Sequence, residues 1–135
     1  MNLPEYLLGT WEVERALEDA ALGAGSFRGS ATFRTDADGI AWEEAGTMRL
    51  GRYAGPARRE LRIAPAGNGW EVSFADGRPF HRLELSGSGC RMHHPCGADS
   101  YDGELELLGP DEFAIRWRVS GPAKAQRLDG RYLRR

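Results

Sequence analysis

Histidine, cysteine, aspartate and tyrosine side chains gather in one short stretch of the chain, between residues 81 and 101. His94 and Cys96 are two residues apart, so on a strand both point to the same face, and Asp99 and Tyr101 follow after a turn. With His81 they form a set suited to acid–base chemistry, in which an imidazole moves a proton, the carboxylate orients it and the phenol donates to an oxyanion. A few polar groups in an apolar wall are also typical of a ligand site.

The two inward histidines share a face only if two turns have the expected lengths. Asp76-Gly77 is a strong hairpin signal because both residues tolerate a positive φ angle. With Gly87-Ser88 as a second two-residue turn, His81 faces His94 across a ladder of hydrogen bonds. A one-residue shift in either turn reverses the side to which His81 points. His93 and His94 lie on opposite faces, so at most one of them faces inward, and the sequence leaves open which one.

The same residues have plainer structural interpretations. An inward histidine is often a hydrogen-bonded part of the core, Asp99 can bond the amides of its own turn, and Tyr101 can place its hydroxyl at a rim. Cys90 and Cys96 on one strand would lie about 20 Å apart, too far for a disulfide. We expect both to be small buried hydrophobic residues, with a reactive thiol at Cys96 as the alternative. The His-x-Cys spacing of His94 and Cys96 is not a zinc motif, so no metal is predicted.

Alternation of apolar and polar residues recurs about every 13 residues and indicates the elements that must position these groups. It predicts strands near residues 8–17, 27–35, 40–50, 57–63, 70–74, 80–86, 90–95, 100–108, 112–120 and 125–134. Short turns between them predict an all-β fold, a closed antiparallel meander β-barrel of about ten strands. A helical turn at Pro4–Leu8 could plug one end. No linker or repeat interrupts the pattern, so we expect one domain over residues 1–135.

Three charged residues, Arg15, Glu44 and Arg59, fall in phase with the apolar residues of their strands. An unpaired charge in a barrel core costs several kcal/mol, so these groups should pair, reach water or meet a charged ligand. An internal Arg–Glu pair and a clamp for an anion both fit this pattern. The residues predicted to line a ligand site are His81, His94, Cys96, Asp99, Tyr101, Arg59, Trp11, Trp42, Trp70 and Met92.

Composition narrows the classes of partner. The 18 basic and 20 acidic residues are interleaved and leave a net charge of −2, so no field of one sign favours nucleic acid. No stretch approaches the roughly 20 apolar residues that cross a bilayer, and the start of the chain lacks a basic leader, so a cytoplasmic location is expected. Motifs for phosphate loops, dinucleotide sites and nucleophile elbows are absent. The expected partner is a small molecule, and a homodimer stays open.

Gly9-Thr10-Trp11 is similar to the Gly-x-Trp signature of lipocalins, which implies that Arg131 or Arg134 of the last strand packs across Trp11. Over nearly its full length the chain resembles a small bacterial calycin-like barrel family of the lipocalin and nitrobindin type, catalogued as domain of unknown function 6314. The resemblance rests on the segments 8–11, 76–81, 94–101 and 121–124. It implies a fold and no activity. Arg131 and Tyr132 are adjacent, so the Arg-x-Tyr grip of fatty-acid-binding proteins is absent.

The leading hypothesis is binding of a small, partly apolar ligand, with an anionic group left open, in the barrel interior. An enzyme of isomerase or cyclase type that uses the cluster around His81 and His94 is the second hypothesis, with no catalytic residue assigned. By analogy with nitrobindins, haem could bind through either histidine. A protein-interaction scaffold with a filled core is the third. A cavity of several hundred Å³ would favour the first two hypotheses, and an exposed apolar patch on Phe80 or Leu133 the third.

Overall fold

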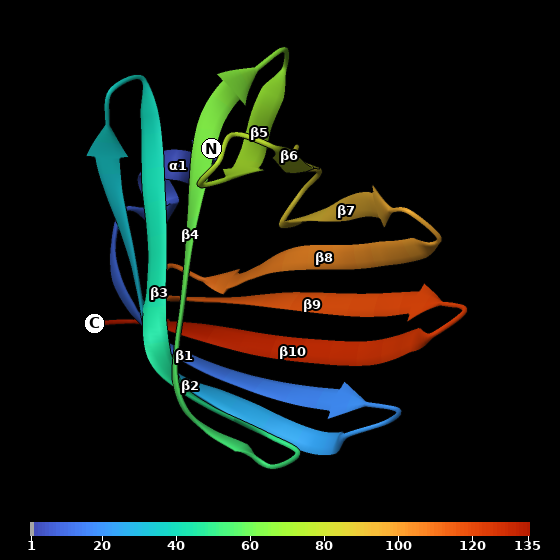
Figure 1. Cartoon of the computed structure of the whole chain (residues 1–135). Coiled ribbons are helices and arrows are strands. Elements are labelled where there is room, and N and C mark those ends of the chain that lie inside the picture. The colour runs from blue at the N-terminus through green and yellow to red at the C-terminus, as the bar shows by residue number, and fades with distance from the viewer. Residues whose placement is uncertain (1) are drawn as a thin grey trace.

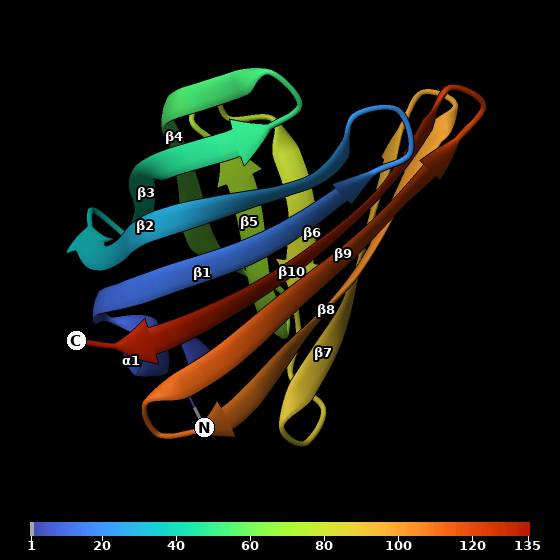
Figure 2. The same ribbon diagram turned by 90° about the horizontal axis from the view of Figure 1, so that it is seen from below.

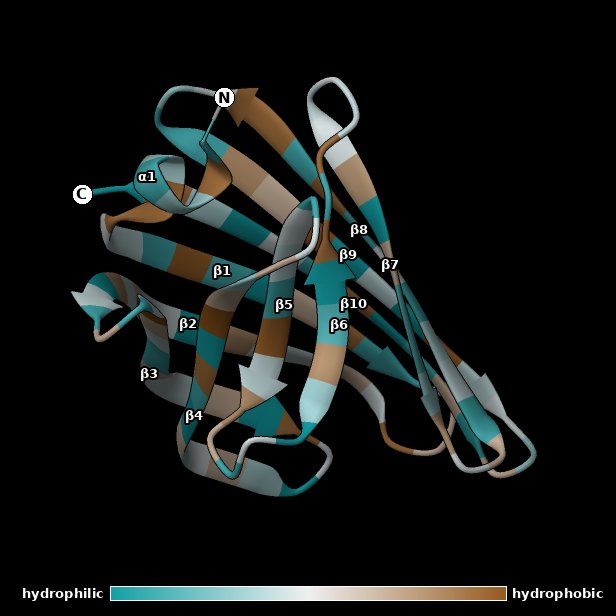
Figure 3. Ribbon diagram, turned by 90° about the horizontal axis from the view of Figure 1, so that it is seen from above, coloured by the Kyte–Doolittle hydropathy of each residue, from teal (hydrophilic) through white to brown (hydrophobic). Residues whose placement is uncertain are grey.

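A computed structural model describes residues 2–135 (Figure 1). One short helix precedes ten strands, each antiparallel to its sheet neighbours. Their bounds are α1 Leu3–Leu7, β1 Gly9–Asp19, β2 Gly23–Asp36, β3 Gly39–Leu50, β4 Tyr53–Ala66, β5 Gly69–Phe74, β6 Pro79–Leu83, β7 Gly89–Cys96, β8 Asp99–Gly109, β9 Glu112–Gly121 and β10 Lys124–Arg134. Figure 3 shows apolar and polar residues alternating along the strands, which is the pattern of a sheet with one buried face.

The sheet order is β6-β5-β4-β3-β2-β1-β10-β9-β8-β7. The first and last strands of the chain pair with each other, with Trp11 opposite Arg134, and the sheet curls into a nearly closed barrel. The predicted all-β antiparallel meander barrel of ten strands is therefore confirmed.

The barrel does not close by hydrogen bonds between β6 and β7. Gly87-Ser88 makes the expected two-residue turn, with a single bridge between Ser86 and Gly89, but across residues 2–135 no ladder continues from it. The predicted ladder that sets His81 opposite His94 is thus wrong. Instead β6 follows β5 and β7 follows β8, and aromatic side chains occupy the space between them.

Helix α1 closes one end of the barrel (Figure 2). Leu3 and Leu7 are buried in the core, and the Leu7 carbonyl accepts a hydrogen bond of 2.8 Å from the indole N–H of Trp11. The guanidinium of Arg134 lies 4.2 Å from the Trp11 ring centroid and donates to the carbonyls of Leu8 and Tyr6. The expected packing of a last-strand arginine on Trp11 is therefore confirmed for Arg134.

The bottom of the barrel near α1 is filled by aromatic rings. Phe113 stacks on Tyr132 with centroids 4.3 Å apart and meets Trp11 edge to face at 4.7 Å. These three side chains are completely buried, and Phe33 joins them.

No helix among the described residues is long and apolar enough to cross a membrane.

A pair of glycines allows the close approach of β2 and β3. Gly29 lies opposite Gly46, and a Cβ atom built on Gly29 would overlap the Ala45 carbonyl oxygen and lie 2.6 Å from Gly46 Cα. Both contacts are with backbone, which cannot rotate away. Glycine is therefore required where the sheet bends here.

We expect Gly29→Ala to lower the free energy of unfolding by about 1–3 kcal/mol, because the new methyl group must push two strands apart. Gly109→Ala is the matched control, because nothing lies within 4 Å of a Cβ at that position. Its effect should stay within about 0.5 kcal/mol. Urea denaturation followed by circular dichroism measures both, and equal losses in the two variants would contradict the close-approach argument.

Candidate functional site

The two ends of the barrel differ in how well their inward side chains are buried. Near α1 these side chains are fully buried, whereas at the opposite end the inward residues Leu17, Met48, Ala57, Leu128 and Arg59 are only half-buried. Five hairpins surround this second end, at residues 19–23, 50–53, 74–79, 96–99 and 121–124, and we call it the mouth (Figure 2). Solvent therefore reaches side chains that point inward at the mouth.

A buried carboxylate lies between the filled bottom and the mouth. Glu44 Oε1 accepts from Arg15 Nη2 at 2.8 Å and from Arg59 Nε at 3.1 Å. Its Oε2 accepts from the Trp42 indole at 3.0 Å, from Arg59 Nη2 at 3.3 Å and from the Tyr132 hydroxyl. Strands β1, β3, β4 and β10 supply these groups, and the register sets Glu44 directly opposite Arg59. The internal Arg–Glu pair that the sequence allowed is formed.

The charges of this cluster are fixed at neutral pH. Burial raises the pKa of Glu44, but Arg59, Arg15 and the Tyr132 hydroxyl outweigh it and hold the pKa at about 2. Burial lowers the pKa of Arg15, and Tyr132 and Glu44 outweigh that effect and raise it. Burial, and after it the charge of Glu44, raises the pKa of Tyr132 to about 12. At neutral pH the cluster therefore contains one carboxylate, Glu44, two guanidiniums, Arg15 and Arg59, and the neutral phenol of Tyr132.

A second group of side chains spans the gap between β6 and β7, and we call it the seam cluster: Phe74, Phe80, His81, His94 and Trp117. Phe80 stacks on Trp117 with centroids 5.3 Å apart and on Phe74 at 4.7 Å. It meets His94 edge to face at 5.2 Å, and His81 lies 5.3 Å from Trp117. Ring contacts thus connect β5 and β6 to β7 and β9 where the backbone ladder is missing.

His81 is a buried, neutral imidazole. Its strand position opposite Val72 is the one that the Asp76-Gly77 turn predicts. Burial lowers the pKa of His81 to about 4; the hydrogen bond with the Arg82 backbone opposes this shift, and the charge of Arg59 adds to it. Nδ1 lies 3.1 Å from the Arg82 carbonyl oxygen and must carry the proton that it donates to that acceptor.

His94 faces the interior and is half-buried, whereas His93 is exposed and lies 2.8 Å from Asp102 on the outer surface. This placement answers which of the two adjacent histidines points inward. Tyr101 lies beside His94, with ring centroids 5.6 Å apart, and its hydroxyl accepts a hydrogen bond of 3.0 Å from Lys124 Nζ. His94, Tyr101 and Lys124 therefore meet at the mouth.

Cys96 and Asp99 lie at the rim and do not join the imidazoles. Cys96 is exposed where β7 ends, so the expectation that both cysteines are buried is wrong for Cys96 and holds for Cys90. Asp99 covers Gly121, and no hydrogen bond within residues 2–135 connects it to His94. Among those residues there is also no group of three or more histidine, cysteine or acidic side chains placed to hold a metal ion.

The remaining predicted residues lie deeper or at the other end. Trp11 belongs to the filled bottom, and Trp70 is half-buried near the hairpin that joins β4 to β5, on the α1 side. Trp42 and Met92 are buried in the wall below the mouth. The fold brings His81, His94 and Tyr101 together through ring contacts with Phe80 and with one another, and Arg59 points inward to Glu44.

Sequence reasoning missed Phe80 as an interior residue. Strict alternation with His81 points Phe80 outward, but the pairing of β5 with β6 shifts between Val72 and Ser73, so that Ser73 faces Pro79. This irregularity lets adjacent residues Phe80 and His81 both contact the interior ring of Trp117. The pattern of polar and apolar residues contains no signal for such a shift.

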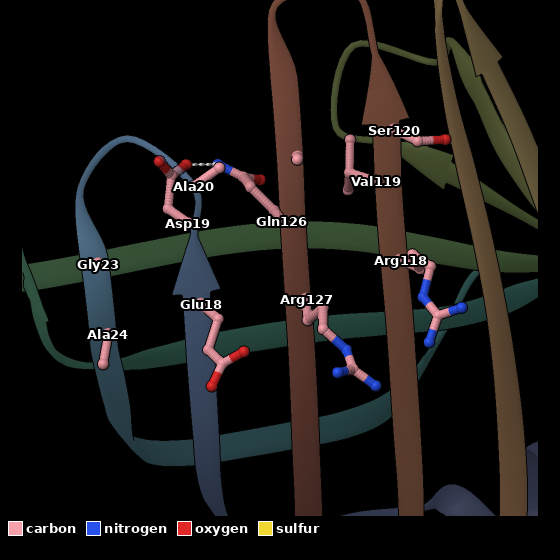
Figure 4. Close-up of a pocket in the computed structure, with 11 residues that line it drawn as sticks. Glu18, Asp19, Ala20, Gly23, Ala24, Arg118, Val119, Ser120, Gln126 and Arg127 are labelled. Atoms are coloured by element: carbon pink, nitrogen blue, oxygen red, sulfur yellow. Dashed lines mark hydrogen bonds between the residues drawn. The ribbon is translucent and has the colours of Figure 1, made fainter.

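Two surface hollows are present, and both are lined mostly by residues that point outward from the barrel. One of about 590 Å³ is bounded at the mouth by the ends of β1, β2, β9 and β10, where Gln126 donates to Asp19 (Figure 4). One of about 740 Å³ lies along β7 to β10 and is lined mainly by outward charged residues. Of the predicted site residues, only Met92 lines one of these hollows, the second. Neither is lined by Arg59, His81, His94 or Tyr101.

We expect Glu44→Gln to lower the free energy of unfolding at pH 7 by about 3 kcal/mol, because it leaves the guanidiniums of Arg15 and Arg59 without a counterion. The folded-state pKa of Glu44 lies below its ordinary value, so the carboxylate contributes stability above about pH 4.5 and loses it as pH falls toward 2. The difference between wild type and variant should shrink over that range in urea titrations. Glu43→Gln, on the outer face, is the control, and a difference that does not change with pH would contradict this role of Glu44.

Comparison with known proteins places this fold among barrels of differing origin. The structure is similar to a protein with unknown function of the DUF3598 family from Nostoc punctiforme, with a TM-score of 0.68 and 11% identity over 98% of this chain and 49% of that one. It is similar to an S-type phycobiliprotein lyase from Guillardia theta, with a TM-score of 0.64 and 8% identity over 98% and 90% of the two chains. A de novo designed fluorescence-activating β-barrel has a TM-score of 0.56 and 17% identity over 100% and 99%.

These identities show the shared barrel fold alone. No curated protein matches the sequence. A family model matches residues 7–134, nearly the whole chain, and confirms the resemblance drawn from the sequence motifs. The protein belongs to the family of unknown function DUF6314.

Proposed function

We propose that the protein binds a small, partly apolar molecule in the part of the barrel between Glu44 and the mouth, which we call the upper half. This guest enters through the mouth. One observation carries this proposal. The Arg59 side chain points inward to Glu44 and yet remains 36% exposed, whereas the Glu44 side chain is 1% exposed. Water reaches the interior as far as this guanidinium, and a guest of suitable shape could displace that water.

The walls of the upper half suit such a guest. The seam cluster offers flat aromatic surfaces, and Arg59 with Tyr101 adds polar groups on other sides of the same space. Lys124 lies 5.5 Å from the Tyr101 ring centroid at the mouth, where it can contact the entering molecule. Ligand sites commonly combine a largely apolar wall with a few polar groups that orient the guest.

Structural relatives are consistent with a guest in a barrel of this size. A redesigned barrel with a TM-score of 0.51 and 18% identity is described as bound to DFHBI, and another relative is a phycobiliprotein lyase. We assign the contacts with the guest to the seam cluster, Tyr101 and Arg59. Cys96 and Asp99 lie at the rim, Trp42 and Met92 support the wall, and Trp11 and Trp70 lie outside the contact surface.

Nile red, a neutral apolar dye, tests the proposal by a fluorescence titration. Ala57 is an inward, half-buried residue at the mouth, and Ala57→Trp should weaken dye binding by about tenfold or more because the indole occupies the guest space. Ala45→Trp places the same ring on the exposed outer face of the adjoining strand β3 and should leave the affinity unchanged. Thermal melting checks that both variants fold.

Native mass spectrometry of the freshly purified protein complements the titration by detecting a retained molecule. Failure of the wild type to bind Nile red, together with no retained molecule, would contradict ligand binding and favour the interaction scaffold. Equal weakening by the two tryptophan variants would contradict the placement of the guest at the mouth.

A further inference from the structure

We propose that the guest carries a single carboxylate and that Arg59, assisted by Arg15, binds this carboxylate on the mouth side of Glu44. The inference rests on the proposed function and adds the chemical class of the ligand, an amphipathic monocarboxylate. It follows from the balance of charge, the hydrogen-bond donors that are left over and the rigidity of the two guanidiniums.

The cluster around Glu44 carries one more positive than negative charge. Arg15 and Arg59 both pair with Glu44, which with His81 makes up the buried polar or charged residues among residues 2–135. His81 is neutral at pH 7, because burial lowers its pKa to about 4, and Tyr132 is neutral because burial raises its pKa to about 12. A singly charged anion would balance the cluster, whereas a dianion would leave an uncompensated negative charge inside the barrel.

Both guanidiniums keep donors that the protein does not use. Arg15 uses Nη2 for Glu44 and Tyr132, and Arg59 uses Nε and Nη2 for Glu44, so within the described chain Nη1 of each donates no hydrogen bond. In that part of the chain the one buried side-chain nitrogen or oxygen without a hydrogen bond is Glu112 Oε2, which forms an ion pair with Arg131. The unused N–H groups are therefore reached by solvent, and a carboxylate could replace the water.

These donors are held in place before any guest arrives. Arg59 donates hydrogen bonds to Glu44 from two nitrogens, and its guanidinium carbon lies 5.3 Å from the Trp42 ring centroid. The guanidinium carbon of Arg15 lies 5.0 Å from the Phe27 ring centroid. A guanidinium fixed in this way loses little conformational entropy when it binds a second carboxylate. The arrangement thus favours binding by a group that has already been ordered by folding.

The anion site and the aromatic site belong to the same space. Arg59 lies on the same face of β4 as Leu61, which is directly opposite Phe74 of the seam cluster, and Phe74 stacks on Phe80. A ligand whose carboxylate reaches Arg59 can therefore lay an aromatic or aliphatic body on these rings. This combination selects an amphipathic acid over a fully polar one.

A matched pair of fluorescent probes tests the inference: dansyl-aminohexanoic acid and its primary amide, which differ only in the charged group. The wild type should bind the acid at least about tenfold more tightly than the amide at pH 7. Arg59→Met should abolish this preference and retain binding of the amide. Arg58→Met is the control, because Arg58 is the neighbouring residue on the outer face and its side chain is 70% exposed, so the preference should persist.

The outcomes separate this inference from the proposed function. Equal affinity of the wild type for acid and amide overturns the carboxylate site but leaves ligand binding intact. Absence of binding for both probes and for Nile red overturns both proposals. A preference for the acid that survives in Arg59→Met, with only a lower melting temperature, shows that Arg59 serves the fold alone. If Arg59→Met does not fold, the acid and amide affinities of the wild type decide.

Discussion

The interaction on which the rest of the structure depends is the burial of Glu44 between two guanidiniums. Its carboxylate connects side chains from four strands that do not all neighbour one another in the sheet. A buried ion pair of this kind needs every donor in place, which fixes the curvature of the barrel around it. It also divides the interior, because apolar rings can fill the space on one side, whereas the surplus positive charge on the other side keeps contact with water.

Side chains replace hydrogen bonds at one position of the barrel wall. The rings of Phe80, His94 and Trp117 bridge strands β6 and β7, whose backbones do not form a ladder. The same rings also border the open interior. A substitution in this group therefore alters both the wall of the barrel and the interior beside it.

The fold was predictable because alternation, hairpin residues and spacing are local features of the sequence. Arg15, Glu44 and Arg59 were recognised as inward for the same reason, since their phase is set by their own strands. The inward position of Phe80 and the missing ladder between β6 and β7 depend on a shift in pairing and on contacts between distant segments. Strand ends are equally hard to infer, and Cys96 is exposed because β7 ends there.

The pairing of β1 with β10 has a consequence for how the chain could be cut and rejoined. Strand β1 begins and strand β10 ends beside α1 (Figure 2), while the break in the sheet lies between consecutive strands β6 and β7. A circular permutant that starts at β7 and ends at β6, with the old termini linked, would have its strands in the order of the sheet. Every pair of neighbouring strands in the sheet would then be consecutive in the sequence. The pairing of β1 with β10, which in the present chain requires the last strand to be synthesised, would become a local contact.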